Sequence, residues 1–172
     1  MKLIASARMQ AEPSSDTALR LEDFLPYRLS VLANLVSGSL ARVYARRFDL
    51  TVPEWRVLAV LGRYPGISAG EVAERAAMDK VTVSRAVARL IARGRLRRGT
   101  NAEDRRRSAL RMTAEGRAVY QRIVPLARAY EAELLADFSP AERTSLDQLI
   151  QRLTGEAARL REPMAPVQAA DD

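Results

Sequence analysis

The chain has 172 residues with a formal net charge of +7 at pH 7, and it contains neither cysteine nor histidine. The missing residue types exclude disulfides, thiolate metal sites and thiol redox chemistry, and they remove the parts of most zinc sites and most catalytic nucleophile–base pairs. We therefore expect a protein that is not an enzyme and that holds no metal and no cofactor. Abundant Ala, Leu and Arg favour a mainly α fold.

The two ends of the chain lack the apolar periodicity of folded elements. Residues 1–20 and residues 162–172 are both predicted to be disordered arms. The N-terminal ten residues lack the apolar core of a signal peptide, and the longest charge-free run, residues 29–41, is too short and too polar to cross a bilayer. The expected location is cytoplasmic, without membrane contact.

A first amphipathic helix is predicted from about residue 23 to residue 48. Its apolar residues recur at spacings of three and four and share one face: Leu25, Leu29, Leu32, Val36, Leu40 and Val43. A second helix is predicted to begin at a capping box, Thr51 with Glu54, with Pro53 in the first turn. This helix is expected to end near Tyr64.

A third and a fourth helix follow. The third is short and opens at a second capping box, Ser68 with Glu71, while the fourth is predicted to run from the N-cap Asp79 to Arg93. The fourth begins with β-branched residues, a type enriched in strands. Helical spacing nevertheless places four apolar residues on one stripe: Val83, Val87, Leu90 and Ile91. A strand would mix Arg with Val on both faces, so a helix is predicted.

The rest of the chain reads as a hairpin followed by two helices. Residues 95–99 and 108–113 are short extended stretches separated by a polar loop, a pattern typical of a β-hairpin. Thr113 is expected to cap a helix that reaches about residue 137. A third capping box, Ser139 with Glu142, opens the last helix.

This element order predicts a mainly α protein with a winged helix-turn-helix over residues 51–113. The helices of residues 21–50 and residues 114–161 are too long, and too apolar on one side, to serve this small lobe alone. Such faces need burial, and an isologous interface would supply it. We therefore expect long N- and C-terminal dimerisation helices and a homodimer.

Positive charge is concentrated in one part of the chain. Residues 80–111 contain 11 basic and 2 acidic residues, a local charge of +9, whereas the other 140 residues sum to −2. A local basic segment is the footprint expected of a surface that binds a polyanion. Double-stranded DNA is therefore the predicted partner.

The fourth helix and the hairpin loop carry the predicted DNA contacts. The first turns of a recognition helix face the major groove, where Arg can read guanine and hydroxyl groups make short contacts. The base contacts are predicted at Lys80, Thr82, Ser84 and Arg85. Phosphate contacts are predicted one and two turns further on, at Arg89 and Arg93. The hairpin loop contains Arg105, Arg106 and Arg107 next to Asp104. Asp104 is predicted to hold the guanidinium of one of these arginines while the other two reach a minor groove.

Four segments of the chain together resemble the MarR family of bacterial transcriptional regulators: LTVPEWRVLAVL, ISAGEVAERAAMDKVTVSRAVARLIARGRLRR, AEDRRRSALRMTAEGR and FSPAERTSLDQLIQRL. The resemblance spans about residues 25–160. It implies a homodimer that binds a palindromic operator, usually as a repressor. In many members of the family, the protein releases DNA when a small phenolic or aromatic acid binds. The wing motif D-x-R of the family falls on Asp104 and Arg106.

The resemblance also implies an effector site between the dimer helices and the DNA-binding lobe, close to Tyr27, Arg28 and Trp55. Arg28 can pair with a carboxylate. From the residues alone, Trp55 equally suits core packing and Arg28 an ordinary surface charge. The missing cysteine excludes the redox-sensing branch of the family. For the whole chain, the alternative function is a winged-helix interaction module that contacts an acidic protein partner.

Overall fold

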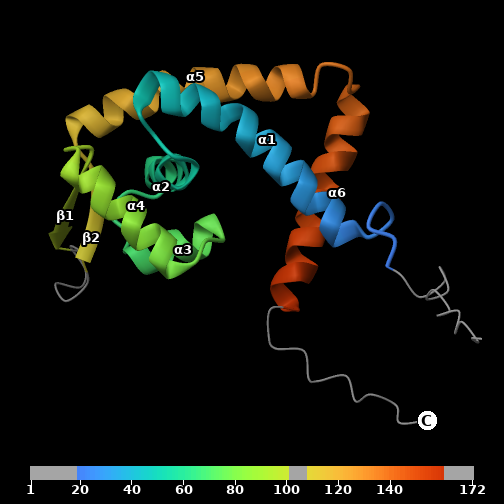
Figure 1. Cartoon of the computed structure of the whole chain (residues 1–172), viewed down its shortest axis with the longest axis horizontal. Helices are drawn as coiled ribbons and strands as arrows, with labels where there is room; N and C mark the ends of the chain where they lie inside the picture. Colours follow the sequence, from blue (N-terminus) through green and yellow to red (C-terminus); the bar gives the residue numbers. More distant parts are fainter. Residues whose placement is uncertain (1–18, 101–107, 161–172) are drawn as a thin grey trace, which may run out of the picture. The chain divides into compact units, whose positions relative to one another are not determined.

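The computed structural model describes residues 19–100 and 108–160, and it contains each of the predicted helices and strands (Figure 1). In chain order they are α1 (Leu25–Phe48), α2 (Val52–Arg63), α3 (Ala69–Ala76), α4 (Lys80–Ala92), β1 (Leu96–Thr100), β2 (Ser108–Met112), α5 (Ala114–Leu134) and α6 (Pro140–Arg159). The mainly α winged helix-turn-helix class is thereby confirmed. The predicted N-terminal arm falls almost entirely outside the described residues, and the predicted C-terminal arm falls entirely outside them.

The chain divides into two compact units, one up to Val119 and one from Tyr120 onward. The first unit holds α1 to α4, the hairpin and the beginning of α5. The second holds the rest of α5 and α6. The division into a DNA-binding lobe and dimerisation helices stays a prediction.

The three predicted capping boxes are confirmed at the starts of α2, α3 and α6. At α2, the backbone N–H of Thr51 donates to Oε2 of Glu54 over 2.7 Å, and the N–H of Glu54 donates to Oγ1 of Thr51 over 3.4 Å. These bonds satisfy donors that the start of a helix leaves open. The local sequence therefore determines where these helices begin.

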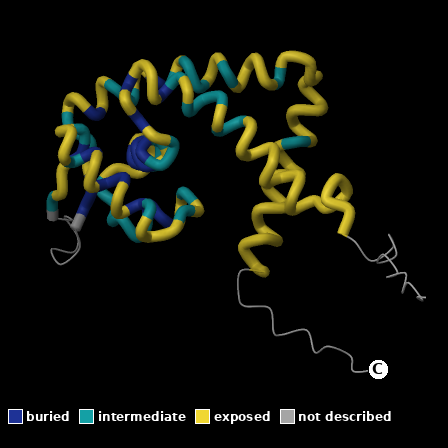
Figure 2. Tube along the Cα trace, viewed as in Figure 1, coloured by how far each residue is buried: buried dark blue, intermediate teal, exposed yellow. Residues whose placement is uncertain are grey.

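The core lies where α2, α3, α4 and the hairpin meet (Figure 2). Its buried side chains include Val57, Leu58, Leu61, Val72, Val83, Val87, Leu90, Leu96 and Leu110. Burying one such side chain contributes about 1.5–3 kcal/mol, whereas a β-branched residue costs a helix well under about 1 kcal/mol. Burial therefore overrides the strand preference at the start of α4. From α1, only the C-terminal end enters the core, through Tyr44 and Phe48.

The hairpin is joined to the helices through the backbone of β2. Leu110 lies opposite Arg98 of β1 in an antiparallel register. On the other side of β2, the N–H of Gly66 donates to the carbonyl of Leu110 over 3.0 Å, and the N–H of Leu110 donates to the carbonyl of Ile67 over 2.9 Å. These bonds attach the hairpin to the connection between α2 and α3.

The first turn of α5 lies against the segment that leads into β1. The hydroxyl of Thr113 donates to the carbonyl of Gly94 over 2.6 Å and accepts from the N–H of Gly116 over 3.0 Å, so Thr113 caps α5 as predicted. A Cβ atom at Gly116 would lie 2.0 Å from the carbonyl oxygen of Arg95. Only glycine fits this close backbone approach.

Candidate DNA interface

Helix α4 presents one face to the core and another to solvent. Val83, Val87 and Leu90 are buried against the rest of the lobe, while Ile91 is only half-buried. The side chains predicted to contact bases lie in the first turns, where Thr82 is half-buried and the others are exposed: Lys80, Ser84 and Arg85. Val81 is also 59% exposed, as a residue that meets a thymine methyl group would have to be.

The N-terminus of α4 is held by Asp79, as the sequence predicts. Its Oδ1 accepts the backbone N–H of Thr82 over 2.8 Å. Hydrogen bonds from Thr82 hold the pKa of this exposed carboxyl below its ordinary value. The cap therefore stays ionised at neutral pH, and it loses its stabilising effect only as the pH falls through that lowered pKa.

A shallow recess of about 210 Å³ lies between α4 and the start of α2. Arg85 and Arg89 line it from α4, together with Thr82, and Thr51 and Pro53 line it from α2. Two guanidinium groups beside the N-terminus of a helix form a setting that suits an anion. Sequence reasoning missed the contribution of α2 to this recess, because the α2 residues precede α4 by about 30 positions and show only a capping signal.

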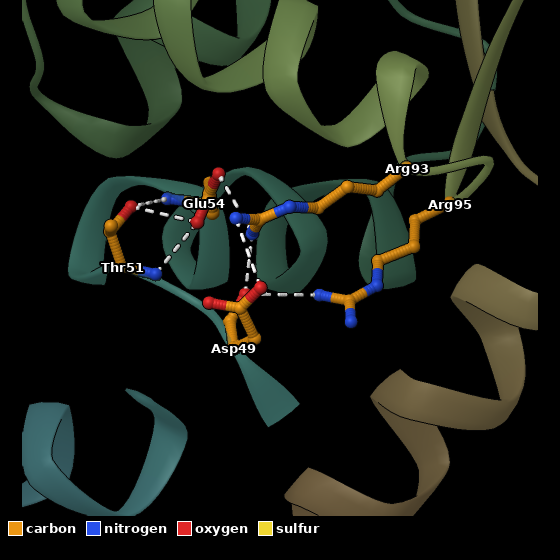
Figure 3. A network of polar contacts seen from close by, with 5 residues as sticks. All are labelled: Asp49, Thr51, Glu54, Arg93 and Arg95. Carbon is orange, nitrogen blue, oxygen red and sulfur yellow. Dashed lines mark hydrogen bonds and ion pairs between the residues drawn. The ribbon is translucent and has the colours of Figure 1, made fainter. Parts of the chain in front are cut away.

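Arg93, for which a phosphate contact is predicted, pairs with acidic groups of its own chain. Its guanidinium reaches the carboxylate of Asp49 over 3.0 Å and Oε1 of Glu54 over 3.6 Å, and it also donates to the carbonyl of Asp49 (Figure 3). Arg95 donates to the same carbonyl over 3.3 Å. Sequence reasoning missed these pairings, because periodicity shows on which face a residue lies but not that a long side chain folds back onto a distant acidic pair.

The described part of the hairpin adds further cationic side chains. Arg97 and Arg98 of β1 and Arg111 of β2 are exposed, and Arg97 lies directly opposite Arg111. The predicted wing residues lie outside the described residues: Asp104, Arg105, Arg106 and Arg107. The hairpin therefore supports a basic surface next to α4.

The three effector candidates do not come together within one chain. Tyr27 and Arg28 are exposed at the start of α1, whereas Trp55 packs on Tyr44 with ring centroids 5.1 Å apart. Tyr44 follows Tyr27 by 17 positions of α1, which corresponds to about 25 Å along the helix axis. Trp55 is half-buried. Within one chain its packing partner is Tyr44, at the opposite end of α1 from the other two candidates.

Tyr44 is a buried polar group that sequence reasoning missed. It is 1% exposed, burial raises its pKa, and its hydroxyl forms no hydrogen bond within the described residues. The available signal was its spacing, because Leu40, Tyr44 and Phe48 continue the apolar stripe at intervals of four.

Within residues 19–100 and 108–160, no group of three or more acidic side chains could hold a metal ion. No helix in the same residues has the length and apolarity needed to span a membrane.

Comparison with known proteins decides the family. A sequence profile of the MarR family matches residues 48–107. The transcriptional regulator HosA of Escherichia coli is 32% identical over 105 residues, which are 61% of this chain and 78% of HosA. The chain belongs to the MarR family. It is a transcriptional regulator of that family, whose members are regulators rather than enzymes.

Other MarR-family relatives cover more of the chain. The transcriptional activatory protein BadR of Rhodopseudomonas palustris is 27% identical over 174 residues, 99% of each protein. Among solved structures, a MarR/EmrR family regulator from Acinetobacter sp. ADP1 has a TM-score of 0.77 at 25% identity and covers 82% of this chain and 99% of that one. PcaV of Streptomyces coelicolor, solved with its natural ligand, has a TM-score of 0.65 at 29% identity, covering 81% and 98%.

Proposed function

We propose that this MarR-family regulator is a homodimer that reads a palindromic operator with α4 and the wing. In this proposal it represses transcription until a small aromatic or phenolic acid releases it. The observation that carries the proposal is the exposed first part of α4, where Lys80, Ser84 and Arg85 face solvent while Val83 and Val87 anchor the helix. This arrangement suits insertion into a major groove.

Base and phosphate contacts divide along α4. Arg85 lies in the second turn and suits bidentate reading of guanine, with Thr82 and Ser84 as shorter hydroxyl contacts. Arg89, one turn further along, shares the recess with Thr51 at the start of α2 and suits a backbone phosphate. The wing residues Asp104, Arg105, Arg106 and Arg107 complete the proposed surface at a minor groove.

Apolar surface on the long helices supports the dimer. Leu25, Leu29 and Leu32 of α1 are between 41% and 54% exposed, although they continue the stripe that is buried at the other end of the helix. On α6 and its C-cap residue, the exposed large apolar residues are Leu149, Ile150, Leu153 and Leu160. Apolar faces of this extent mark interaction sites. A dimer would place two α4 helices in major grooves about 34 Å apart.

The DNA-reading proposal predicts different effects for two arginines of α4. Arg85→Ala should lower operator affinity by about 1–3 kcal/mol and relax base preference at one position, because a base contact is lost. Arg89→Ala should weaken operator and random DNA alike and reduce the salt slope by about one, because a phosphate contact is lost. Mobility shifts on an operator selected from genomic fragments, repeated at several salt concentrations, measure both effects.

The same measurements test the competing function. Wild-type protein that binds no duplex at low salt would contradict the DNA-reading proposal and favour the module that contacts an acidic protein. Unchanged affinity of both variants for operator would contradict the assignment of α4 as the reading helix. A reporter gene behind the selected operator then tests repression, since expression should rise when the regulator is deleted.

An aromatic acid effector is proposed from two relatives and three side chains. PcaV was solved with its natural ligand, and 6-hydroxynicotinic acid regulates DNA binding of BpsR from Bordetella bronchiseptica, which is 25% identical to this chain. Because Tyr27 and Arg28 lie about 25 Å along α1 from the Trp55 contact, a site that uses all three draws them from two protomers. Arg28 would pair with the carboxylate.

This effector proposal predicts that an aromatic carboxylic acid dissociates the operator complex. Arg28→Ala should raise the concentration needed about tenfold, because a charge-assisted hydrogen bond is lost, while leaving operator affinity without the acid unchanged. Titration of a panel that includes 6-hydroxynicotinic acid, monitored by fluorescence anisotropy of labelled operator, measures this. Equal half-release concentrations for wild type and variant would contradict a role for Arg28.

A further inference from the structure

A polar cluster joins the corner between α1 and α2 to the C-terminal end of α4, and the proposed DNA contacts do not use it. We refer to its four residues, Asp49, Glu54, Arg93 and Arg95, as the corner clamp (Figure 3). We propose that the corner clamp sets the orientation of α4 and that Arg93 is a positioning residue for operator discrimination. The proposal rests on the DNA-reading function of α4.

Glu54 makes the corner clamp more than a surface ion pair. Its side chain is 1% exposed. One carboxylate oxygen, Oε2, accepts the N–H and the hydroxyl of Thr51 over 2.7 and 3.0 Å and so caps α2. The other, Oε1, accepts no hydrogen bond within the described residues and lies 3.6 Å from Arg93. Since a buried charge is costly without a partner, Glu54 holds the guanidinium of Arg93 against α2.

Asp49 supplies the second attachment. It is the C-cap of α1 and has a left-handed backbone with φ of 49°, which turns its carbonyl toward the end of α4. That carbonyl accepts from both Arg93 and Arg95, and the carboxylate of Asp49 pairs with Arg93 over 3.0 Å. A planar guanidinium that faces the carbonyl and carboxylate of Asp49 and the carboxylate of Glu54 fixes direction as well as distance.

The buried apolar side chains of α4 do not by themselves fix the orientation of the helix axis. Burial of Val83, Val87 and Leu90 favours contact but is not directional. Arg93 follows Lys80 by 13 positions, which is about 20 Å of helix, so a tilt of about 5° at Arg93 shifts the first turn by nearly 2 Å. A shift of that size breaks hydrogen bonds to bases. Contacts to phosphates tolerate it better, because charge attraction falls off slowly with distance.

The test compares Arg93→Lys with Arg89→Lys on a selected operator and on a random duplex of equal length, across a salt series. Lysine keeps the charge and binds phosphate, but it lacks the fork that spans Asp49 and Glu54. We expect Arg93→Lys to lose about tenfold in operator affinity, with random-duplex affinity and salt slope unchanged. Arg89→Lys, at a proposed phosphate contact, should change operator and random-duplex affinity by the same factor, so that the ratio of the two affinities stays that of wild type.

Asp49→Asn is the second variant, because Asn also tolerates the left-handed backbone and the Asp49 side chain is 79% exposed. Like Arg93→Lys, it should lower the ratio of operator affinity to random-duplex affinity, and it should leave the melting temperature measurably unchanged. Unchanged ratios for both variants, or equal losses on operator and random DNA, would overturn the positioning role. If wild-type protein itself fails to discriminate operator from random DNA, the DNA-reading function fails, and the role of the corner clamp fails with it.

Discussion

Gly116→Ala is expected to lower the free energy of unfolding by about 3 kcal/mol, which is opposite in sign to the usual effect of this substitution in a helix. The added Cβ would lie 2.0 Å from the carbonyl oxygen of Arg95, and the nearby atoms are backbone atoms that cannot rotate away. The first turn of α5 would have to move from the segment that leads into β1. That movement would strain the hydrogen bonds of the Thr113 cap.

Gly155 in α6 provides the matched control, because a Cβ placed there would meet nothing within 4 Å beyond its chain neighbours and the nearby backbone of its own helix. Gly155→Ala should therefore stabilise the protein by up to about 1 kcal/mol through helix propensity and reduced freedom of the unfolded chain. Urea unfolding followed by circular dichroism measures both variants. Stabilisation of the Gly116→Ala variant would show that the close approach to Arg95 does not constrain the start of α5.

The order of elements and their starts could be predicted because both depend on local sequence. Capping boxes such as Ser68 with Glu71 act within one turn, and the 3.6-residue period shows which side of α4 is buried. The close approach at Gly116 could not be predicted in this way. It depends on where the backbone at Arg95 lies, and an isolated glycine near the start of a helix gives no such information.

The sequence predicted which residues of the candidate site are exposed, but it did not predict the ion pairs and hydrogen bonds between residues far apart in the chain. Arg85, Arg89 and Arg93 share a similar spacing along the basic segment, so the sequence suggested DNA contacts for all three. In the structure, Arg93 pairs with Asp49 and Glu54, which lie 44 and 39 positions earlier in the chain. Pairings across such distances depend on tertiary structure and leave no periodic signal.

The pattern of α1 illustrates the same limit at larger scale. One apolar stripe runs along the whole helix, but Tyr44 and Phe48 are buried while Leu25 and Leu32 remain about half exposed. Periodicity identifies an apolar face and says nothing about what covers it. The exposed end of this stripe and the apolar side of α6 are two separate surfaces for which the dimer proposal supplies a partner.

Replacing Leu149 and Leu153 of α6 together by Glu is expected to convert the proposed dimer to monomers and to reduce operator affinity at least about hundredfold, since two linked half-site contacts become independent. The two side chains are 59% and 38% exposed, lie one turn apart on one face, and line a shallow recess of about 350 Å³. Burying two carboxylates against a second apolar face would cost more than the interface regains.

The matched control for this double variant is Thr144→Glu with Gln148→Glu, which adds the same charges at the same spacing on the opposite, exposed side of α6. It should remain dimeric and bind operator like wild type. Sedimentation equilibrium and mobility shifts measure the two properties, and circular dichroism checks that helix content is retained. A Leu149/Leu153 variant that remains dimeric would show that this face of α6 lies outside the interface. A monomeric variant with full operator affinity would show instead that one α4 helix and wing suffice for binding, because affinity would then not depend on a second half-site.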